Sequence, residues 1–460
     1  NSAPVTENKM GTMPIGRLVF NMSLPMMISM LVQALYNIVD SIFVAKLSEN
    51  ALTAVSLAFP LQTLIIAVAT GTGVGVNALL SKSLGAHKYD EANKIGINGA
   101  VLYAFSYVIF LILGLTIVKP FYMSQIGNAD VEIMDMGVSY LSTVMIFSFG
   151  IFAEIYFERV LTSTGRTIFS MTSQLCGAIT NIILDPIMIF GLLGFPKLGA
   201  TGAAVATVVG QCVAAVVAFV CNHKFNHEIS LSFKGYSPDF KIMGTIYAIG
   251  IPSIIMQSIG SLMTYAMNRI LIGFSSTAAA VFGVYFKLQS FFFMPVFGLN
   301  NGITPIIAFN YGAQNRKRMV KTIKVSLITA FCLLFVGFAC FEFIPQVLLG
   351  MFSASDDMLK IGVPALRIIG VHFLIAWFCI IVGTVFQALG KAVFSMIVSI
   401  MRQLVVLIPA AYILSKLGGL HAVWWAFPIA EVISFTVSTI FLIRINRTII
   451  SKIPDGSDVL

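Results

Sequence analysis

Residues 18–47 read LVFNMSLPMMISMLVQALYNIVDSIFVAKL, a run of thirty residues in which only Asp40 and Lys46 carry a charge. About 20 apolar residues are enough to cross the hydrocarbon core of a bilayer. The run is also much longer than the hydrophobic region of a secretory signal peptide. We therefore expect a retained membrane helix here and not a cleaved leader.

The rest of the chain has the same apolar character. Of its 460 residues, 58% are hydrophobic and 10% are charged, whereas about a quarter of the residues in soluble domains are charged. This composition excludes an ordinary soluble protein. It predicts an all-α integral membrane protein, because a helix satisfies its own backbone hydrogen bonds in lipid.

Polar and turn-forming residues divide the chain into twelve apolar segments, each long enough to cross a membrane. The predicted spans are residues 17–47, 52–81, 92–118, 133–162, 167–193, 200–222, 240–273, 277–308, 319–345, 358–386, 393–416 and 419–445. The connection between the sixth and seventh spans is long enough to serve as a linker.

Lysine and arginine residues fall unequally on the two sides of the predicted membrane. With the N-terminus in the cytoplasm, nineteen lie on the cytoplasmic side and six on the other. Basic residues in short loops set orientation, so we expect a protein of the cytoplasmic (plasma) membrane with both termini in the cytoplasm. The same distribution explains the net charge of +9, and we expect no nucleic-acid partner.

The sequence matches itself at a shift of about 227 residues, in the same direction. The matching segments are residues 83–86 with 310–313, residues 161–171 with 386–396, and Gly199 with Gly419. Parallel repeats of this kind occur in transporters, where two lobes expose a site between them alternately to each side of the membrane. We predict two six-helix lobes, residues 1–228 and 241–460, joined by a cytoplasmic linker at 229–240.

Acidic residues inside membrane spans are costly and are usually retained for function. Asp40, Asp185 and Thr207 lie six to eight residues from the outer ends of their predicted spans, which places them at a common depth of about 10 Å. Asn181 lies one turn before Asp185 on the same helix face. These oxygen-bearing groups predict an ion-coupling site for a proton or for Na⁺. The alternative is a carboxyl pair that serves helix packing only.

Two further acids, Glu154 and Glu158, lie one turn apart on the inner half of the fourth span, and Arg159 follows them. They are possible cavity acids, although Glu158 could instead lie at the cytoplasmic interface beside Arg159. Pro25 in the first span removes a backbone hydrogen bond and can kink that helix. The alternative is a proline that the helix tolerates without movement.

Few polar groups interrupt the spans of the second half. We expect Arg402 to pair with Glu431 or to extend toward the membrane surface. The motif Gly71-Thr-Gly73-Val-Gly75 predicts close helix packing and not nucleotide binding, because it lies inside a membrane span. Apart from possible Na⁺ at the coupling site, we expect no metal. Candidates for a substrate cavity, chosen for aromatic, amide and thioether groups, are Tyr36, Asn37, Met256, Gln257 and Met294.

Two motifs are characteristic in combination: Asn181-Ile-Ile-Leu-Asp185-Pro186 in the fifth span and Gly202-Ala-Ala-Val-Ala-Thr207 in the sixth. Together with Pro25 and Asn37-Ile-Val-Asp40, they make nearly the whole chain resemble the multidrug and toxic compound extrusion (MATE) family. The resemblance is to its DinF-like and MepA-like branch.

This resemblance implies export of drugs or toxic metabolites in exchange for H⁺ or Na⁺. It also implies that Asp40, Asn181, Asp185 and Thr207 form the cation site. Another branch of the family uses acids in the seventh and tenth helices. The present chain departs from that branch, since Gln257 lies in its seventh span.

Two other functions compete with this interpretation. A flippase for lipid-linked oligosaccharides has a related architecture but typically lines its cavity with many arginines, which are few here. A membrane-embedded enzyme would need clustered His, Asp or Cys residues, and the five histidines are scattered. We therefore expect a transporter and no enzyme, a monomer with no cofactor, and small molecules and membrane lipid as its only partners.

Overall fold

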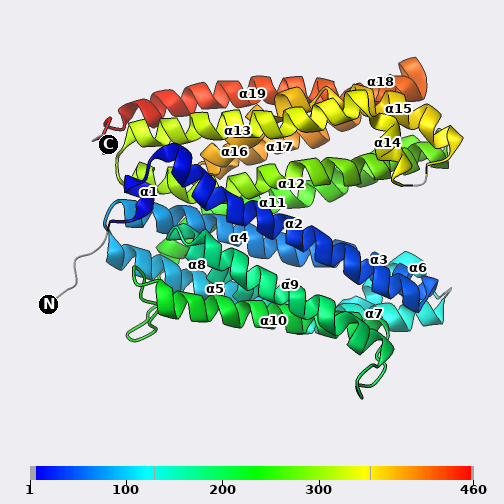
Figure 1. Ribbon diagram of the computed structural model, residues 1–460, viewed down its shortest axis with the longest axis horizontal. Coiled ribbons are helices and arrows are strands. Elements are labelled where there is room, and N and C mark those ends of the chain that lie inside the picture. The colour runs from blue at the N-terminus through cyan, green and yellow to red at the C-terminus, as the bar shows by residue number, and fades with distance from the viewer. Residues whose placement is uncertain (1–6, 129, 353, 457–460) are drawn as a thin grey trace. The chain divides into compact units, whose positions relative to one another are not determined.

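The computed structural model describes residues 7–128, 130–352 and 354–456, and these residues form helices and connections with no strand (Figure 1). In the first half, the helices are α1 (Lys9–Thr12), α2 (Ile15–Leu47), α3 (Glu49–Leu57), α4 (Phe59–Gly85), α5 (Tyr89–Thr116), α6 (Val118–Ile126), α7 (Val131–Ile146), α8 (Phe149–Ser163), α9 (Thr167–Phe190) and α10 (Ala200–Phe225). In the second half, they are α11 (Phe240–Ile272), α12 (Ser276–Gly312), α13 (Arg316–Phe343), α14 (Pro345–Gly350), α15 (Asp356–Gly370), α16 (Phe373–Ala388), α17 (Ala392–Ile400), the π-helix η1 (Met401–Leu407), α18 (Ile408–Val423), α19 (Ala426–Thr448) and the 3₁₀ helix η2 (Ile450–Lys452).

The prediction of twelve membrane spans is confirmed. Among the described residues, ten helical stretches are long and apolar enough to cross a membrane, and two bent helix pairs complete the twelve. The pair α7 and α8 is bent by 42°, and the pair α15 and α16 by 50°. These pairs form the fourth and tenth predicted spans, so both halves break at equivalent positions.

The border between the last two spans differs from the prediction. The twelfth span was expected from residue 419, but α18 continues to Val423 and α19 begins at Ala426. Gly419 has φ of 71° and ψ of −162° and interrupts α18. The glycine therefore marks a break, as expected, but one further helical turn separates it from the last helix.

Residue contacts divide the chain into two compact units whose borders lie inside helices. Unit 1 combines Asn1–Met27 with Ile255–Leu460, and unit 2 is Ile28–Ile254. The borders cut α2 and α11 two residues after Pro25 and Pro252, where the backbone hydrogen-bond ladder lacks a donor. The units thus differ from the lobes drawn from the repeat, since each unit contains the first part of a helix from the other lobe.

Unit 1 holds the start of the chain through buried polar contacts. Asn310 donates to the carbonyl oxygen of Met10 at 3.1 Å. Arg318 donates to the carbonyl oxygens of Met10 and Met13 at 3.0 and 2.7 Å. These contacts fasten α1 and the residue that caps its end, Met13, to α12 and α13.

The backbone confirms the internal repeat. Ser48 and Ser275, 227 residues apart, cap α3 and α12 by accepting hydrogen bonds from the N–H groups of Ala51 and Ala278 at 3.0 and 3.1 Å. Equivalent residues with positive φ are His87 and Gln314, Gly165 and Gly390, and Gly199 and Gly419. The two halves therefore share these turns and caps between their helices.

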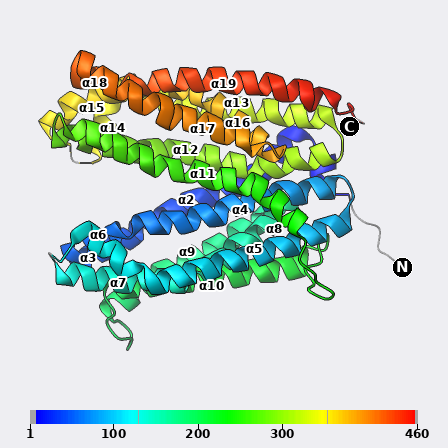
Figure 2. The same ribbon diagram turned by 180° about the vertical axis from the view of Figure 1, so that it is seen from behind.

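Glycine allows close helix packing in unit 2. A Cβ atom on Gly177 would lie 2.8 Å from the carbonyl oxygen of Gly210, and one on Gly210 would lie 2.8 Å from that of Gly177. The helices α9 and α10, which lie side by side in Figures 1 and 2, thus approach too closely for a larger residue at either position. Gly75 likewise packs on the carbonyl oxygen of Ile246, at 2.4 Å from an added Cβ. The packing interpretation of the Gly71-Thr-Gly73-Val-Gly75 motif is confirmed.

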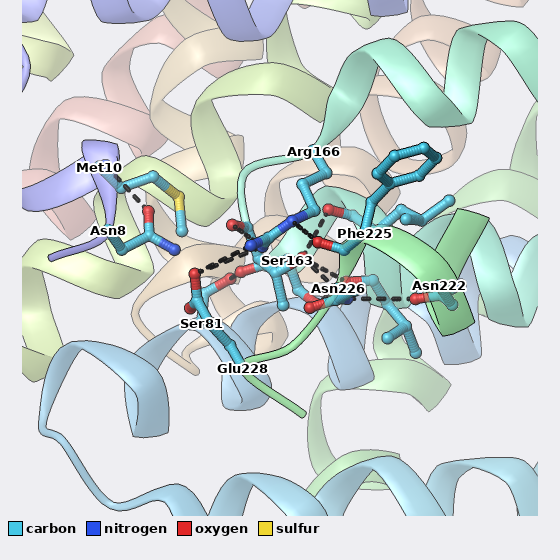
Figure 3. A network of polar contacts seen from close by, with 12 residues as sticks. Asn8, Met10, Ser81, Ser163, Arg166, Asn222, Phe225, Asn226 and Glu228 are labelled. Carbon is cyan, nitrogen blue, oxygen red and sulfur yellow. Dashed lines mark hydrogen bonds and ion pairs between the residues drawn. The ribbon is translucent and has the colours of Figure 1, made fainter. Parts of the chain in front are cut away.

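The turn between α8 and α9 is tied to the end of α10. Arg166 donates from Nε to the carbonyl oxygen of Phe225 at 2.9 Å and pairs with Glu228 at 3.3 Å (Figure 3). Asn226 donates to Asn222 Oδ1 at 3.1 Å. The segment that leads into the predicted linker is therefore anchored within unit 2.

Candidate ion-coupling site

Three helices of unit 2 carry the four residues of the predicted coupling site. Asp40 lies two turns before the end of α2, and Asn181 and Asp185 lie one turn apart on α9. Thr207 lies in the second turn of α10. Because glycine brings α9 and α10 close together, the polar faces of these two helices meet, and the structure unites all four residues.

The two aspartates lie within hydrogen-bonding reach of each other. Asp185 has no solvent exposure, and the Oδ1 atom of each carboxyl is buried with no hydrogen-bond partner. Two ionised carboxylates at this separation repel each other strongly in a low-dielectric environment. The pair is therefore suited to take up a proton or a monovalent cation and to release it again.

Asn181 connects the carboxyl pair to α10. With its NH₂ group facing Asp185, it donates to Oδ2 at 3.0 Å while its oxygen accepts from Thr207 Oγ1 at 3.2 Å. In the opposite orientation, the NH₂ group donates to Thr207 Oγ1 at 3.2 Å and the oxygen faces Asp185. The first orientation suits an ionised Asp185 and the second a protonated one. Asn181 can therefore satisfy both charge states.

Two tyrosines surround the pair. Tyr140 of α7 lies within electrostatic reach of Asp40, and its hydroxyl accepts from Gln62 Nε2 at 3.0 Å. Tyr36, one turn before Asp40 on α2, lies within electrostatic reach of Asp40 and Asp185. Sequence reasoning named Tyr36 but missed Tyr140 and Gln62. A signal for Gln62 was present, because the Leu-Gln dipeptide at 61–62 recurs at 288–289.

The two possible cavity acids lie toward the other end of α9. Glu154 of α8 is 8% exposed. Glu158 accepts a hydrogen bond from Ser173 Oγ of α9 at 2.8 Å. Glu158 is thus bonded inside unit 2, and Ser173 is a partner that the sequence did not reveal, because a lone serine in a span carries no pattern.

Unit 1 contains a different polar cluster. Arg402 of η1 pairs with Glu431 of α19 at 3.8 Å, which is one of the two predicted outcomes. The hydroxyl of Tyr285 and Oε1 of Glu431 are buried without a hydrogen-bond partner. His372 lies nearby at the break between α15 and α16, with Nδ1 2.6 Å from the carbonyl oxygen of Ile369. A lone histidine and a tyrosine carry no spacing signal, so the sequence did not reveal them.

The remaining cavity candidates are divided between the two units. Asn37 is exposed on α2 in unit 2, beside Tyr36. In unit 1, Sδ of Met256 lies 3.7 Å from Gln387 Nε2, Gln257 is exposed on α11, and Met294 is half-buried on α12. Their role in a substrate cavity stays a prediction. Within the described part of the chain, no group of three or more His, Cys, Asp or Glu residues could hold a metal ion.

Comparison with known proteins gives consistent relatives along nearly the whole chain. The MatE family model matches residues 25–187 and 252–413. The chain is 28% identical over 445 residues to the multidrug export protein MepA of Staphylococcus haemolyticus (strain JCSC1435), covering 95% of this chain and 96% of that protein. It is 27% identical over 424 residues to MepA of Staphylococcus aureus (strain MSSA476), with 91% of each chain covered.

Solved structures share the fold. An outward-facing multidrug resistance MATE family transporter of the MOP superfamily superposes with a TM-score of 0.89 at 26% identity, covering 98% of this chain and 100% of that one. A MOP superfamily transporter from Pyrococcus furiosus Vc1 (DSM3638), described with a binding pocket of reverse polarity that suggests a different function, gives 0.89 at 25% identity, covering 98% and 100%. The architecture is thus the same in transporters whose binding pockets differ.

Proposed function

The chain belongs to the MATE family of multi-pass membrane transporters, and we propose that it exports drug-like organic compounds in exchange for H⁺ or Na⁺. The relatives named as multidrug export proteins support drugs as its cargo. We infer that its substrates are cationic or amphipathic. Ion gradients drive the cycle, and no cofactor takes part.

The observation that carries the ion-coupled part of the proposal is the Asp40–Asp185 pair. Both Oδ1 atoms are buried without a partner, and Asn181 can meet either charge state of Asp185. A pair of carboxyls kept for packing alone would have its oxygens satisfied by neighbouring donors. Unsatisfied oxygens at a buried pair instead suit an ion that comes and goes.

Exchange requires that ion and drug favour different states of the protein. An ion bound between Asp40 and Asp185 draws α2 toward α9, and the proline at position 25 allows α2 to bend as this happens. The state that holds the ion then releases drug, and the state that has lost the ion binds drug. Alternation between these states carries the two cargoes in opposite directions.

The protein lies in the plasma membrane, and we infer that it works as a monomer with both termini in the cytoplasm. The unequal distribution of lysine and arginine supports this orientation. A cysteine introduced at Leu231, in a variant without native cysteines, tests it. We expect no labelling by a membrane-impermeant reagent in intact cells and full labelling after permeabilisation; labelling of intact cells would reverse the orientation.

Transport in reconstituted vesicles tests the exchange directly. Efflux of a fluorescent cationic dye is measured with a proton gradient at constant Na⁺, and separately with a Na⁺ gradient at constant pH. We expect at least one gradient to drive dye against its own concentration gradient and to identify the coupling ion. Dye movement that ignores both gradients would contradict ion coupling.

Equilibrium binding tests the competition between ion and drug. Linkage requires that the ion weaken drug affinity by the factor with which the drug weakens ion affinity, about 1 to 3 kcal/mol for typical coupled sites. Drug affinity is measured in detergent across a range of pH, with and without Na⁺. A drug affinity that is indifferent to both ions, in a protein that still exports, would place coupling outside the aspartate pair.

A further inference from the structure

We propose that Glu154 and Glu158 form a second centre that takes up one further monovalent cation in each cycle, so that one drug molecule is exchanged for two cations. The proposal rests on the exchange proposed above and adds its stoichiometry. Both acids lie on α8, one turn apart, and belong to unit 2 together with the aspartate pair.

The glutamates form a centre separate from the aspartates. One face of α9 carries residues at intervals of four, namely Ser173, Gly177, Asn181 and Asp185. Ser173 Oγ donates to Glu158 Oε1 at 2.8 Å. Since Asp185 lies twelve residues further along the helix, the two positions are about 18 Å apart along the axis. Glu158 and Asp185 therefore lie at the two ends of one helix face, and Glu154 lies one turn from Glu158 on α8.

Glu154 is the residue whose negative charge requires a bound cation. It is 8% exposed, and it has neither a hydrogen bond nor an ion pair among the described residues. The titratable groups that face it are Glu158, which repels it, Tyr36 from α2 and Cys212 from α10. A carboxylate buried in this way is strongly unfavourable unless its charge is neutralised. A proton or a small cation shared with Glu158 supplies the missing charge.

Arg159 does not remove the need for that charge. It follows Glu158 in the chain and attracts that carboxyl. Its side chain lies along α4, because a Cβ atom on Gly73 would come within 2.8 Å of Arg159 Cγ and 2.9 Å of Nε. One arginine can balance one of two carboxylates, and the second negative charge stays within the pair.

Polar side chains link the two centres. Tyr36 lies within electrostatic reach of Glu154, Asp40 and Asp185. Next to Ser173 in the chain, Gln174 of α9 donates to Gln33 Oε1 of α2 at 3.4 Å. The charge at one centre therefore acts on the other through α2. This coupling lets both cations bind and leave in the same cycle.

The occupant is an inorganic cation and not the organic cargo. Glu154 is nine-tenths buried, and one oxygen of Glu158 is already bonded to Ser173. The small exposed fraction of Glu154 suits a proton or a bare monovalent ion, and the two sources differ in their response to pH and to Na⁺.

The number of ions exchanged per drug molecule is measured in proteoliposomes from the steady accumulation of tetraphenylphosphonium, a monovalent organic cation. Valinomycin and equal K⁺ on both sides hold the membrane potential at zero. The logarithm of the accumulation ratio is plotted against the logarithm of the proton gradient, and in a second arm against that of the Na⁺ gradient. The slope of each arm equals the number of those ions exchanged. For the wild-type protein, we expect the two slopes to add to two.

The double variant Glu154→Gln/Glu158→Gln should still accumulate tetraphenylphosphonium, but its slopes should add to one. The single variant Glu158→Gln, which keeps an acceptor for Ser173, should give the same sum and replaces the double variant if that one does not fold. Asp135→Asn, which removes an exposed carboxyl of α7 in the same unit, is the matched control and should keep the wild-type sum.

Three results separate the alternatives. A sum of one in the wild-type protein, or an unchanged sum in the glutamate variants, would overturn the second centre. Weaker tetraphenylphosphonium binding with an unchanged sum would also overturn it, because the glutamates would then hold the drug. Failure of the exchange itself has a different signature, since neither gradient would drive accumulation even in the wild-type protein.

Discussion

The two halves of the chain share their helix connections but not their buried charges. The caps at Ser48 and Ser275 and the positive-φ turns recur at equivalent positions. The acids do not recur: with shifts of 225 to 227 residues, Asp40 corresponds to Met267, Glu154 to Cys379 and Asp185 to Ala410. The repeat thus retained the groups that position helices, while only one half retained acids that lack a fixed counter-charge.

Glu431, the buried acid of the described second half, has its own cation. Glu431 pairs with Arg402 at 3.8 Å, whereas Asp40, Asp185 and Glu154 have no basic partner among the described residues. A carboxylate that already pairs with an arginine of the protein does not require a mobile ion to neutralise its charge. This difference supports the proposal that ion coupling belongs to unit 2 and that the Arg402–Glu431 pair of unit 1 is structural.

The largest expected effect comes from Asp185→Asn, which removes the charge that attracts the ion. We expect loss of gradient-driven export with unchanged expression, because the neutral amide relieves a buried charge while abolishing ion binding. Glu431→Gln is the matched variant in unit 1 and should retain export. Dye efflux from vesicles measures both. Wild-type efflux in Asp185→Asn, or none in Glu431→Gln, would break the comparison.

The next effect concerns stability. Arg402→Leu leaves Glu431 buried without its partner, and we expect a loss of about 1 to 3 kcal/mol. Removing both charges in Arg402→Leu/Glu431→Leu should restore much of that loss, since no unpaired charge stays buried. Thermal unfolding in detergent tests the pair through a double-mutant cycle. Additive losses would show that the two side chains do not interact.

A smaller effect is expected at the two prolines that mark the unit borders. Alanine at Pro25 or Pro252 restores a backbone hydrogen-bond donor and stiffens the helix. We expect both variants to fold and to transport more slowly, by an amount equivalent to about 0.5 to 2 kcal/mol of coupling. Pro25→Ala should have the stronger effect, because α2 also carries Asp40. Equal rates in both variants and the wild-type protein would exclude bending at either position.

The smallest effect is expected at the shared caps. Ser48→Ala and Ser275→Ala each remove one side-chain acceptor at a helix start, at a cost of about 1 kcal/mol. Because the two caps have nearly identical geometry, we expect equal shifts in the thermal unfolding midpoint and no change in transport. Unequal shifts would show that the repeated connections do not contribute equally to the two halves.

Much of the site could be predicted from the sequence because intramembrane acids are few. Asp40 and Asp185 were found by depth, and Asn181 by its spacing of four from Asp185. The partners Ser173 and Tyr140 were missed, since small polar and aromatic residues are common in membrane helices and carry no spacing signal, whereas Gln62 was missed although its Leu-Gln dipeptide recurs in the second half. Their roles depend on which helix faces them.

By itself, the sequence determined the twelve spans and the repeat, because a segment that crosses the bilayer must be mostly apolar, and hydropathy records that demand directly. Tertiary structure alone decided that the units exchange the first parts of α2 and α11. Hydropathy is the same on both sides of Pro25 and Pro252, so no local pattern shows where a helix leaves one unit for the other. Packing alone decides the division. Gly75 of α4 packs against α11, and Asn310 and Arg318 hydrogen-bond to the start of the chain.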